Sequence, residues 1–120
     1  MTAELILNEA LTRLGYVDSE GLPRTEEYAK VGLSAVNAIC TELHYAENEE
    51  DNTPLESLAD EVNISTRYIR EILPSGVAML VAQSEGDSEH QRMFAECYNS
   101  KLSALNHFEQ RPVSSLGVVL

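Results

Sequence analysis

The histidines and cysteines are the side chains of this sequence best suited to act as nucleophiles, bases or metal ligands. They are His44, His90, His107, Cys40 and Cys97. The histidines stand far apart, and the sequence contains neither a CxxC pair nor a GxGxxG, GxxxxGKS or GxSxG motif. We therefore expect free, buried thiols in a reducing compartment, histidines at or near the surface, no metal site, no cofactor and no catalytic residues.

Carboxylates are concentrated in one segment. Residues 42–61 contain no Lys or Arg and carry the acids Glu42, Glu47, Glu49, Glu50, Asp51, Glu56, Asp60 and Glu61. The densest part, from Glu47 to Asp51, lacks the ligand spacing and the turn glycine of a calcium loop. Two interpretations stay open: a solubilising loop, or an acidic surface that faces a DNA path or a basic partner.

Residues 55–73, LESLADEVNISTRYIREIL, resemble a helix-turn-helix. In that arrangement Asn63 would take the turn between the helices, and Arg67 and Arg70 would lie on the recognition helix and contact DNA. A protein that reads DNA normally carries a basic face, whereas these two cations stand beside the acidic segment. A DNA-binding regulator is therefore the alternative function.

The C-terminal residues are apolar and uncharged after Pro112. Their large side chains are Val113, Leu116, Val118, Val119 and Leu120. Exposed apolar strips usually mark interfaces, and a short segment of this kind can fill a groove of a partner. The tail either docks on such a partner or folds back on its own core.

Apolar residues recur at helical spacing through most of the chain. The pattern predicts helices over residues 3–14, 25–45, 66–85 and 88–111, with Pro74 either kinking or dividing the third. Thr2, Thr25, and Asp87 or Ser88 are the expected N-caps, and Pro112 is expected to end the last helix. We expect an all-α bundle of four main helices, a short extra helix near residue 56, and an extended tail. Residues 1–111 would form the domain and residues 112–120 the tail.

Composition narrows the class of protein. The 120 residues fit one domain, and a hydrophobic content of 43% is typical of globular chains. The net charge of −12 opposes binding to phosphate backbones. Neither a signal peptide nor an apolar run of the ~20 residues that a membrane span needs is visible, so no membrane partner is expected.

A resemblance to a known family covers about residues 3–108. The segments EALTRLGYVD, SLADEVNIS, IREILPSGVAMLVAQSEGD and QRMFAECYNSKLSAL are similar to head–tail connector proteins (adaptor or neck proteins) of tailed bacteriophages. That family has a Pro-x-Gly-x-Ala helix, an acidic-glycine turn, and a long helix with a Phe-x-x-x-Tyr pattern. The matching residues here are Pro74, Gly76, Ala78, Glu85, Gly86, Asp87, Phe94 and Tyr98.

The resemblance implies a structural subunit rather than an enzyme. Such subunits form a ring, typically a dodecamer, beneath the portal protein in the neck of the virion, after assembly in the host bacterial cytoplasm. The ring extends the DNA channel toward the tail, lets genomic DNA pass without specific binding, and docks a downstream neck or tail protein. We expect the acidic segment from Glu47 to Asp51 at the channel or its lower rim, and the apolar tail on the portal.

Overall fold

The computed structural model describes residues 1–46 and 53–117, without the side chains of residues 45, 46, 71 and 106–117. Its elements are α1 (Ala3–Leu14), α2 (Ala29–Ala46), α3 (Thr66–Glu71), α4 (Leu73–Ser84) and α5 (Ser88–Gly117). Apart from two isolated β-bridges, extended pairing is absent from this described part. The all-α class with four main helices is confirmed.

The first helix forms as its sequence predicts. Thr2 is the N-cap, and its hydroxyl accepts a hydrogen bond from the Leu5 N–H at 3.3 Å. Gly15 ends the helix with a φ of 79°, a left-handed conformation that costs glycine little. The apolar face of α1 is buried, with Ile6, Leu7 and Leu11 fully covered.

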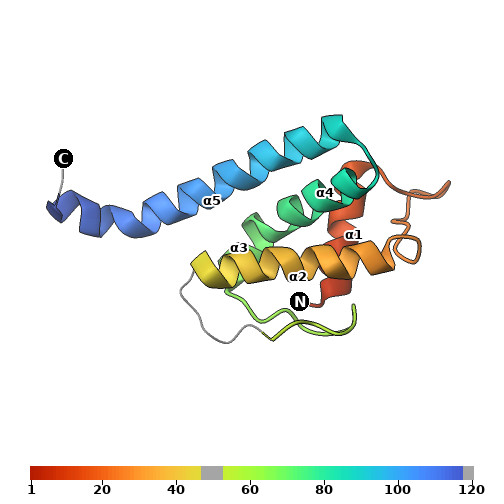
Figure 1. Ribbon diagram of the computed structural model, residues 1–120, viewed down its shortest axis with the longest axis horizontal. Coiled ribbons are helices and arrows are strands. Elements are labelled where there is room, and N and C mark those ends of the chain that lie inside the picture. Colours follow the sequence, from red (N-terminus) through yellow and green to blue (C-terminus); the bar gives the residue numbers. More distant parts are fainter. Residues whose placement is uncertain (47–52, 118–120) are drawn as a thin grey trace.

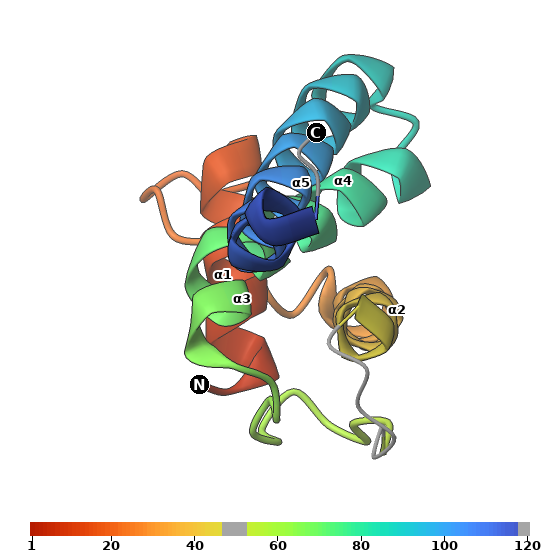
Figure 2. The same cartoon turned by 90° about the vertical axis from the view of Figure 1, so that its left-hand side faces the viewer.

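Helix α4 is the centre of the bundle. It contacts α1, α2, α3 and α5, and Figure 1 shows it enclosed between α5 and α2. The view in Figure 2 places α1 and α3 on one side of the bundle and α2 on the other. Residues 73–78 of α4 are all buried. The apolar run that follows Pro74 therefore lies in the most central helix.

Two glycines let helices approach closely. A Cβ at Gly32 of α2 would collide with the side chain of Leu7 on α1. A Cβ at Gly76 of α4 would lie 3.0 Å from three carbons of Ile39 on α2. Helix packing therefore explains glycines that would otherwise weaken a helix interior by up to about 1 kcal/mol each.

Pro74 divides the predicted third helix instead of kinking it. Helix α3 ends at Glu71, and Pro74 lies in the first turn of α4. The N–H that proline lacks is one that the first turn of a helix would leave unbonded in any case.

The second helix begins later than expected. Residues 25–28 form turns, and α2 starts at Ala29. The hydroxyl of Thr25 donates a hydrogen bond to the side-chain oxygen of Asn8 on α1. Thr25 therefore ties the connection to α1 instead of capping α2.

The short helix expected near residue 56 is not formed. Residues 53–65 are a loop with one turn, and the extra helix is α3 instead. The carbonyls of Leu58 and Asp60 accept hydrogen bonds from the N–H groups of Glu4 and Ala3, at 2.9 and 3.0 Å. These bonds satisfy free donors at the start of α1, so the carbonyls serve a neighbouring helix rather than one of their own.

The last helix continues past Pro112 to Gly117, so the predicted stop at Pro112 is wrong. A proline removes one backbone hydrogen bond from a helix interior and often kinks it without ending it. Figure 1 shows α5 changing direction toward its C-terminal end. Residues 112–117 are thus helical and not extended.

Candidate assembly surfaces

Most residues predicted to form the acidic surface and the docking tail lie outside the described part of the structure. Glu47, Glu49, Glu50 and Asp51 lie outside the described residues, as do Val118, Val119 and Leu120. Val113 and Leu116 fall in the last turns of α5, where only the backbone is described. The structure therefore places the start of the tail on a helix.

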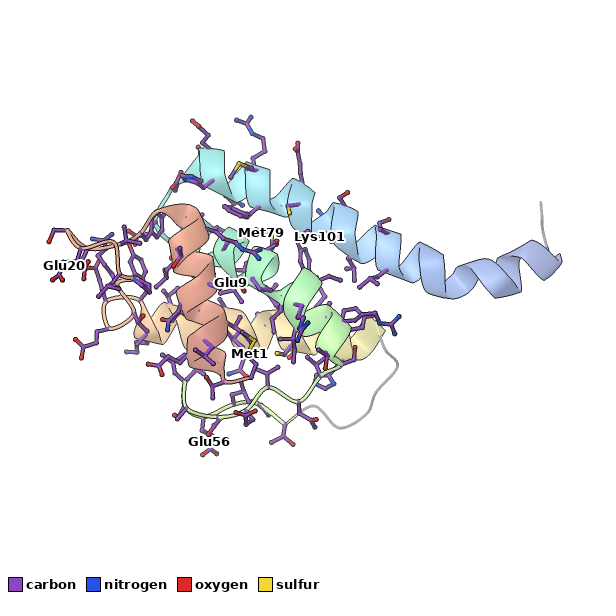
Figure 3. The ribbon with its side chains drawn as sticks, turned by 180° about the vertical axis from the view of Figure 1, so that it is seen from behind. Met1, Glu9, Glu20, Glu56, Met79 and Lys101 are labelled. Atoms are coloured by element: carbon purple, nitrogen blue, oxygen red, sulfur yellow. The ribbon has the colours of Figure 1, made fainter. Side chains whose placement is uncertain are left out.

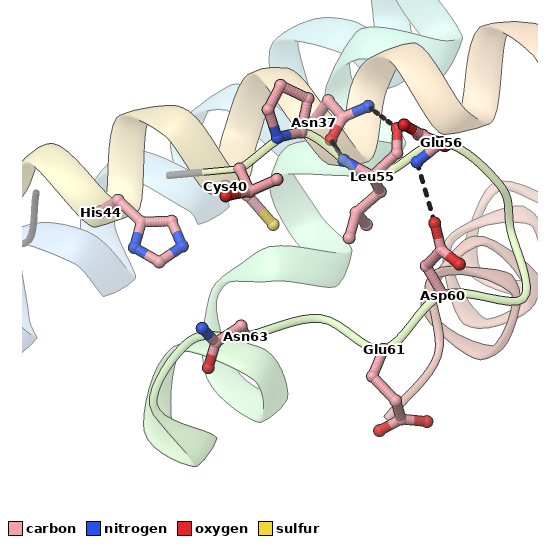
Figure 4. Close-up of a pocket in the computed structure, with 10 residues that line it drawn as sticks. Asn37, Cys40, His44, Leu55, Glu56, Asp60, Glu61 and Asn63 are labelled. Atoms are coloured by element: carbon pink, nitrogen blue, oxygen red, sulfur yellow. Dashed lines mark hydrogen bonds between the residues drawn. The ribbon is translucent and has the colours of Figure 1, made fainter. Parts of the chain in front are cut away.

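The loop that follows the acidic segment packs firmly on α2. The Asn37 side chain donates to the Leu55 carbonyl at 3.0 Å and accepts from the Leu55 N–H at 2.7 Å. The Asp60 carboxylate accepts from the N–H groups of Glu56 and Ser57, at 2.9 and 3.1 Å. Figure 4 shows the bonds between Asn37 and Leu55 and the bond between Glu56 and Asp60, beside a pocket of about 330 Å³ between this loop and α2.

The pocket contains a thiol and an imidazole, which are Cys40 and His44 on successive turns of α2. Both residues are buried, and burial raises the pKa of the Cys40 thiol to about 11. A thiol with a raised pKa is a poor nucleophile at neutral pH, because the reactive form is the thiolate. Cys40 is therefore a packing residue, and the expectation of a free, buried thiol is confirmed for it.

Cys97 lies in a more polar setting than Cys40. It is a free thiol of intermediate exposure on α5, 3.4 Å from the Ser75 hydroxyl. The guanidinium of Arg13 on α1 lies 3.4 Å from the same hydroxyl. Sequence analysis placed both cysteines inside, and for Cys97 this is only partly correct. The contact joins α1, α4 and α5 at one point.

Both candidate DNA contacts, Arg67 and Arg70, are exposed on α3. Helix α3 has only six residues, and the segment where the first helix of the motif should lie, residues 55–62, is the loop described above. A recognition helix is held in the major groove by the helix that packs across it. That arrangement is not present around Arg67 and Arg70.

Helix α5 is held to the bundle along its first half. Phe94 and Tyr98 are buried, and Leu102 and Leu105 pack partly against the core. The Tyr98 hydroxyl donates a hydrogen bond to the Glu42 carboxylate on α2. Burial, followed by this carboxylate, raises the pKa of Tyr98 above its usual value.

The second half of α5 leaves the bundle. The helix has 30 residues, a length of roughly 45 Å at 1.5 Å per residue, and the molecule measures 54 × 31 × 21 Å. In Figure 1 no other helix lies beside its C-terminal end. In sequence, Phe108 continues the three-to-four residue spacing of Leu102 and Leu105.

A polar and aromatic cluster that the sequence did not predict lies at the other end of α5. Asp87, the N-cap of α5, accepts hydrogen bonds from the Tyr16 hydroxyl and from Nδ1 of His90, both at 2.7 Å. The bond from Tyr16, followed by that from His90, lowers the pKa of Asp87. The Tyr28 hydroxyl donates to Glu85 at 3.0 Å, and its ring stacks on Tyr16.

This cluster fastens the connection between α1 and α2 to the turn between α4 and α5. Burial, followed by the bond to Asp87, raises the pKa of Tyr16, and burial with Glu85 raises that of Tyr28. Both phenols therefore stay protonated and donate to carboxylates. The only part of this cluster that the sequence predicted was the N-cap of α5, at Asp87 or Ser88. The structure assigns the cap to Asp87.

Comparison of the chain with family models, with curated proteins and with solved structures found no significant match. Over the described ranges, no three His, Cys, Asp or Glu side chains are grouped so that they could hold a metal ion. Of the helices described, none has both the length and the apolar character needed to cross a membrane.

Proposed function

We propose that this chain is a structural subunit of a phage head–tail connector ring. In this proposal it docks on the portal protein, contacts copies of itself, and extends the DNA channel toward a downstream neck or tail protein in the virion neck. The observation that carries the proposal is the second half of α5, which extends beyond the bundle. A helix without packing partners gains most of its stability when another surface covers it, as it would in an assembly.

Charge supports the same function. A channel for DNA should repel phosphates, because cations that bind phosphates release counterions and hold the nucleic acid in place. The net charge of −12 satisfies this requirement. We place Glu47, Glu49, Glu50 and Asp51 at the lumen or the lower rim of the ring, and a ring structure with these residues on its outer wall would contradict that placement.

The test is attachment to the portal protein by a chain that lacks residues 112–120. We expect the shortened chain to lose attachment in a pull-down with purified portal, while its far-UV circular dichroism changes only by the few helical residues removed. The full-length chain is the control and should form ring-shaped particles with portal in negative-stain micrographs. Unchanged attachment would refute the role of the tail.

The same proteins test the alternative function. A DNA-binding regulator would bind short duplex DNA with an affinity that falls steeply as salt is added, and Arg67→Ala with Arg70→Ala would abolish that binding. We expect no such binding, because the described structure has a loop in place of the first helix of the motif. A tight, sequence-selective complex would overturn the connector proposal.

A further inference from the structure

An apolar side chain is exposed on a tight turn between α1 and α2. Leu22 is 58% exposed, more than any other large apolar residue in the described part of the chain. A leucine in this position has no core to join within its own chain. Single exposed apolar residues are common, so the backbone that presents Leu22 and the surfaces available to it decide its significance.

The turn that presents Leu22 is rigid. The Asp18 carboxylate accepts hydrogen bonds from the N–H groups of Glu20 and Leu22, at 2.8 and 3.0 Å. The Asp18 N–H donates to the Leu22 carbonyl at 2.8 Å, and Gly21 takes a φ of 84°. A bridge between Val17 and Pro23 closes the base of the turn. A side chain on such a preformed turn loses little backbone entropy when it binds.

A groove that could receive such a side chain lies on another face of the molecule, between α1 and α3. Its volume is about 590 Å³, and it is lined by Met1, Glu9, Thr66, Ile69 and Arg70. Leu5 lies between Met1 and Glu9 at four-residue spacing on α1 and is 50% exposed. Glu9 is paired with Arg13 at 3.2 Å, so its charge is balanced. Of the five lining residues, Met1 and Ile69 are apolar, Thr66 is polar, and Arg70 carries a charge that Glu9 does not balance.

The charge of the groove is complementary to the charge of the turn. Arg70 is exposed and forms no ion pair with any residue that the structure describes. The turn at Leu22 carries the exposed Glu20, and Glu20 likewise has no ion-pair partner within the described ranges. The turn thus offers an apolar side chain beside an acid, and the groove offers apolar side chains beside a base.

The two features lie on different parts of the molecule. Figure 3 shows Glu20 at one end, away from Met1 and Glu9. A turn that entered the groove would therefore belong to a second chain. A contact between two different faces is heterologous, and repeated copies of it give a ring when the rotation closes.

We propose that the turn of residues 18–23 docks into the α1–α3 groove of a second copy of this chain, with Leu22 against Ile69 and Glu20 beside Arg70. The inference rests on the proposed ring function, because it names the subunit contact that such a ring requires. Burial of Leu22 supplies the apolar contact, and the charge pair fixes the orientation of the two copies.

The experiment measures self-association of the full chain by sedimentation velocity up to millimolar concentration, with negative-stain microscopy of the same samples. Leu22→Asp should raise the dissociation constant at least about tenfold. Met93→Asp is the matched control, because Met93 is an apolar residue with 50% exposure on α5 and belongs to neither surface. Circular dichroism should show that both variants remain folded.

Charge reversal gives a second and more specific readout. Glu20→Arg and Arg70→Glu should each weaken association when alone, because each places like charges together. A mixture of the two variants should associate again, since every contact between unlike copies then pairs opposite charges.

Three outcomes would overturn the proposed contact: a wild-type chain that stays monomeric, assemblies that Leu22→Asp leaves unchanged, or a mixture that fails to associate. A different outcome would remove the connector function alone. If association depends on Leu22 and Arg70 but yields only filaments or pairs that never close, the contact stands and the ring does not.

Discussion

Tyrosine hydroxyls bonded to carboxylates connect distant parts of this chain. Tyr16, Tyr28 and Tyr98 donate to Asp87, Glu85 and Glu42, across 71, 57 and 56 positions of sequence. A hydrogen bond to a charged acceptor contributes about 1.5–3 kcal/mol, more than most surface ion pairs. Each of these bonds is lost when its phenol ionises.

Stability should therefore fall in alkaline solution. The pKa of Tyr98 is raised in the folded chain above about 10 in the unfolded chain. Above that pH the unfolded state releases the phenolic proton and the folded state keeps it, so the free energy of unfolding decreases by about 1.4 kcal/mol per pH unit for this group. The stabilisation is complete below pH 10 and is lost as pH rises toward the folded pKa.

Tyr98→Phe tests this linkage. We expect the variant to be less stable by about 1.5–3 kcal/mol at pH 8 and to show a shallower fall between pH 10 and 11 than the wild type. Urea unfolding at a series of pH values measures both quantities. An identical slope in the two proteins would show that Tyr98 ionises as easily in the folded state as in the unfolded one.

These residue pairs could not be predicted from the sequence. Each joins segments that only the tertiary fold brings together, and neither Tyr nor Glu has a local pattern that reveals its partner. The cap of α5 was narrowed to Asp87 or Ser88 because capping depends on residues three positions apart. The aromatic cluster around that cap joins segments that are distant in sequence, so no local signal predicts it.

At the scale of elements, the contact between α2 and α4 depends on a missing side chain. Gly76 has no Cβ, and Ile39 occupies the space where one would lie. Overpacking of a well-filled core typically costs 1–3 kcal/mol, and a helix that is buried on several sides cannot shift to relieve it.

Gly76→Val should therefore reduce the free energy of unfolding by about 1–3 kcal/mol. The control is Ala38→Val on the exposed side of α2, where only helix propensity changes and the cost should stay below about 0.7 kcal/mol. Thermal or urea unfolding compares the two. Equal stability of both variants would mean that the contact at Gly76 is loose enough to admit a larger residue.

Element boundaries were predictable where local chemistry sets them. Thr2 and Gly15 bound α1, and Pro74 lies in the first turn of α4, because caps and proline act within one turn. The helix near residue 56 was predicted wrongly, since the carbonyls of Leu58 and Asp60 serve α1 instead. Pro112 was given too much weight, because one missing hydrogen bond does not end a helix of 30 residues.

At the scale of the whole molecule, like charge opposes compactness. Among the described residues, three ion pairs do not involve histidine, and their groups are exposed or half-exposed. Each such pair contributes little to stability. A net charge of −12 therefore acts mainly as self-repulsion. Added salt screens this repulsion, because the Debye length shortens to about 8 Å at physiological ionic strength.

Salt should consequently stabilise the chain at pH 7. We expect the midpoint of urea unfolding to rise as sodium chloride increases from about 0.01 to 0.15 M; urea is used because it is uncharged. The control is the same series near pH 4.5, where the sequence carries no net charge and the effect should vanish. A lower midpoint at pH 7 would mean that attractive ion pairs dominate.

The fold class was predictable from the helical spacing of apolar residues, whereas the arrangement of helices was not. Periodicity shows which face of a helix is buried but does not identify the partner helix. The groove between α1 and α3 joins residues near position 5 with residues near position 70, so only the fold reveals it. The exposure of Leu22 was likewise visible only in the structure.

The central position of α4 has a consequence for synthesis on the ribosome. All four other helices contact it, yet it lies in the second half of the chain. When α1 and α2 leave the exit tunnel, the helix that covers their apolar faces has not yet emerged from it. At roughly 5–20 residues per second, the nascent chain spends several seconds with those faces uncovered, which makes it a client for chaperones that bind emerging polypeptides.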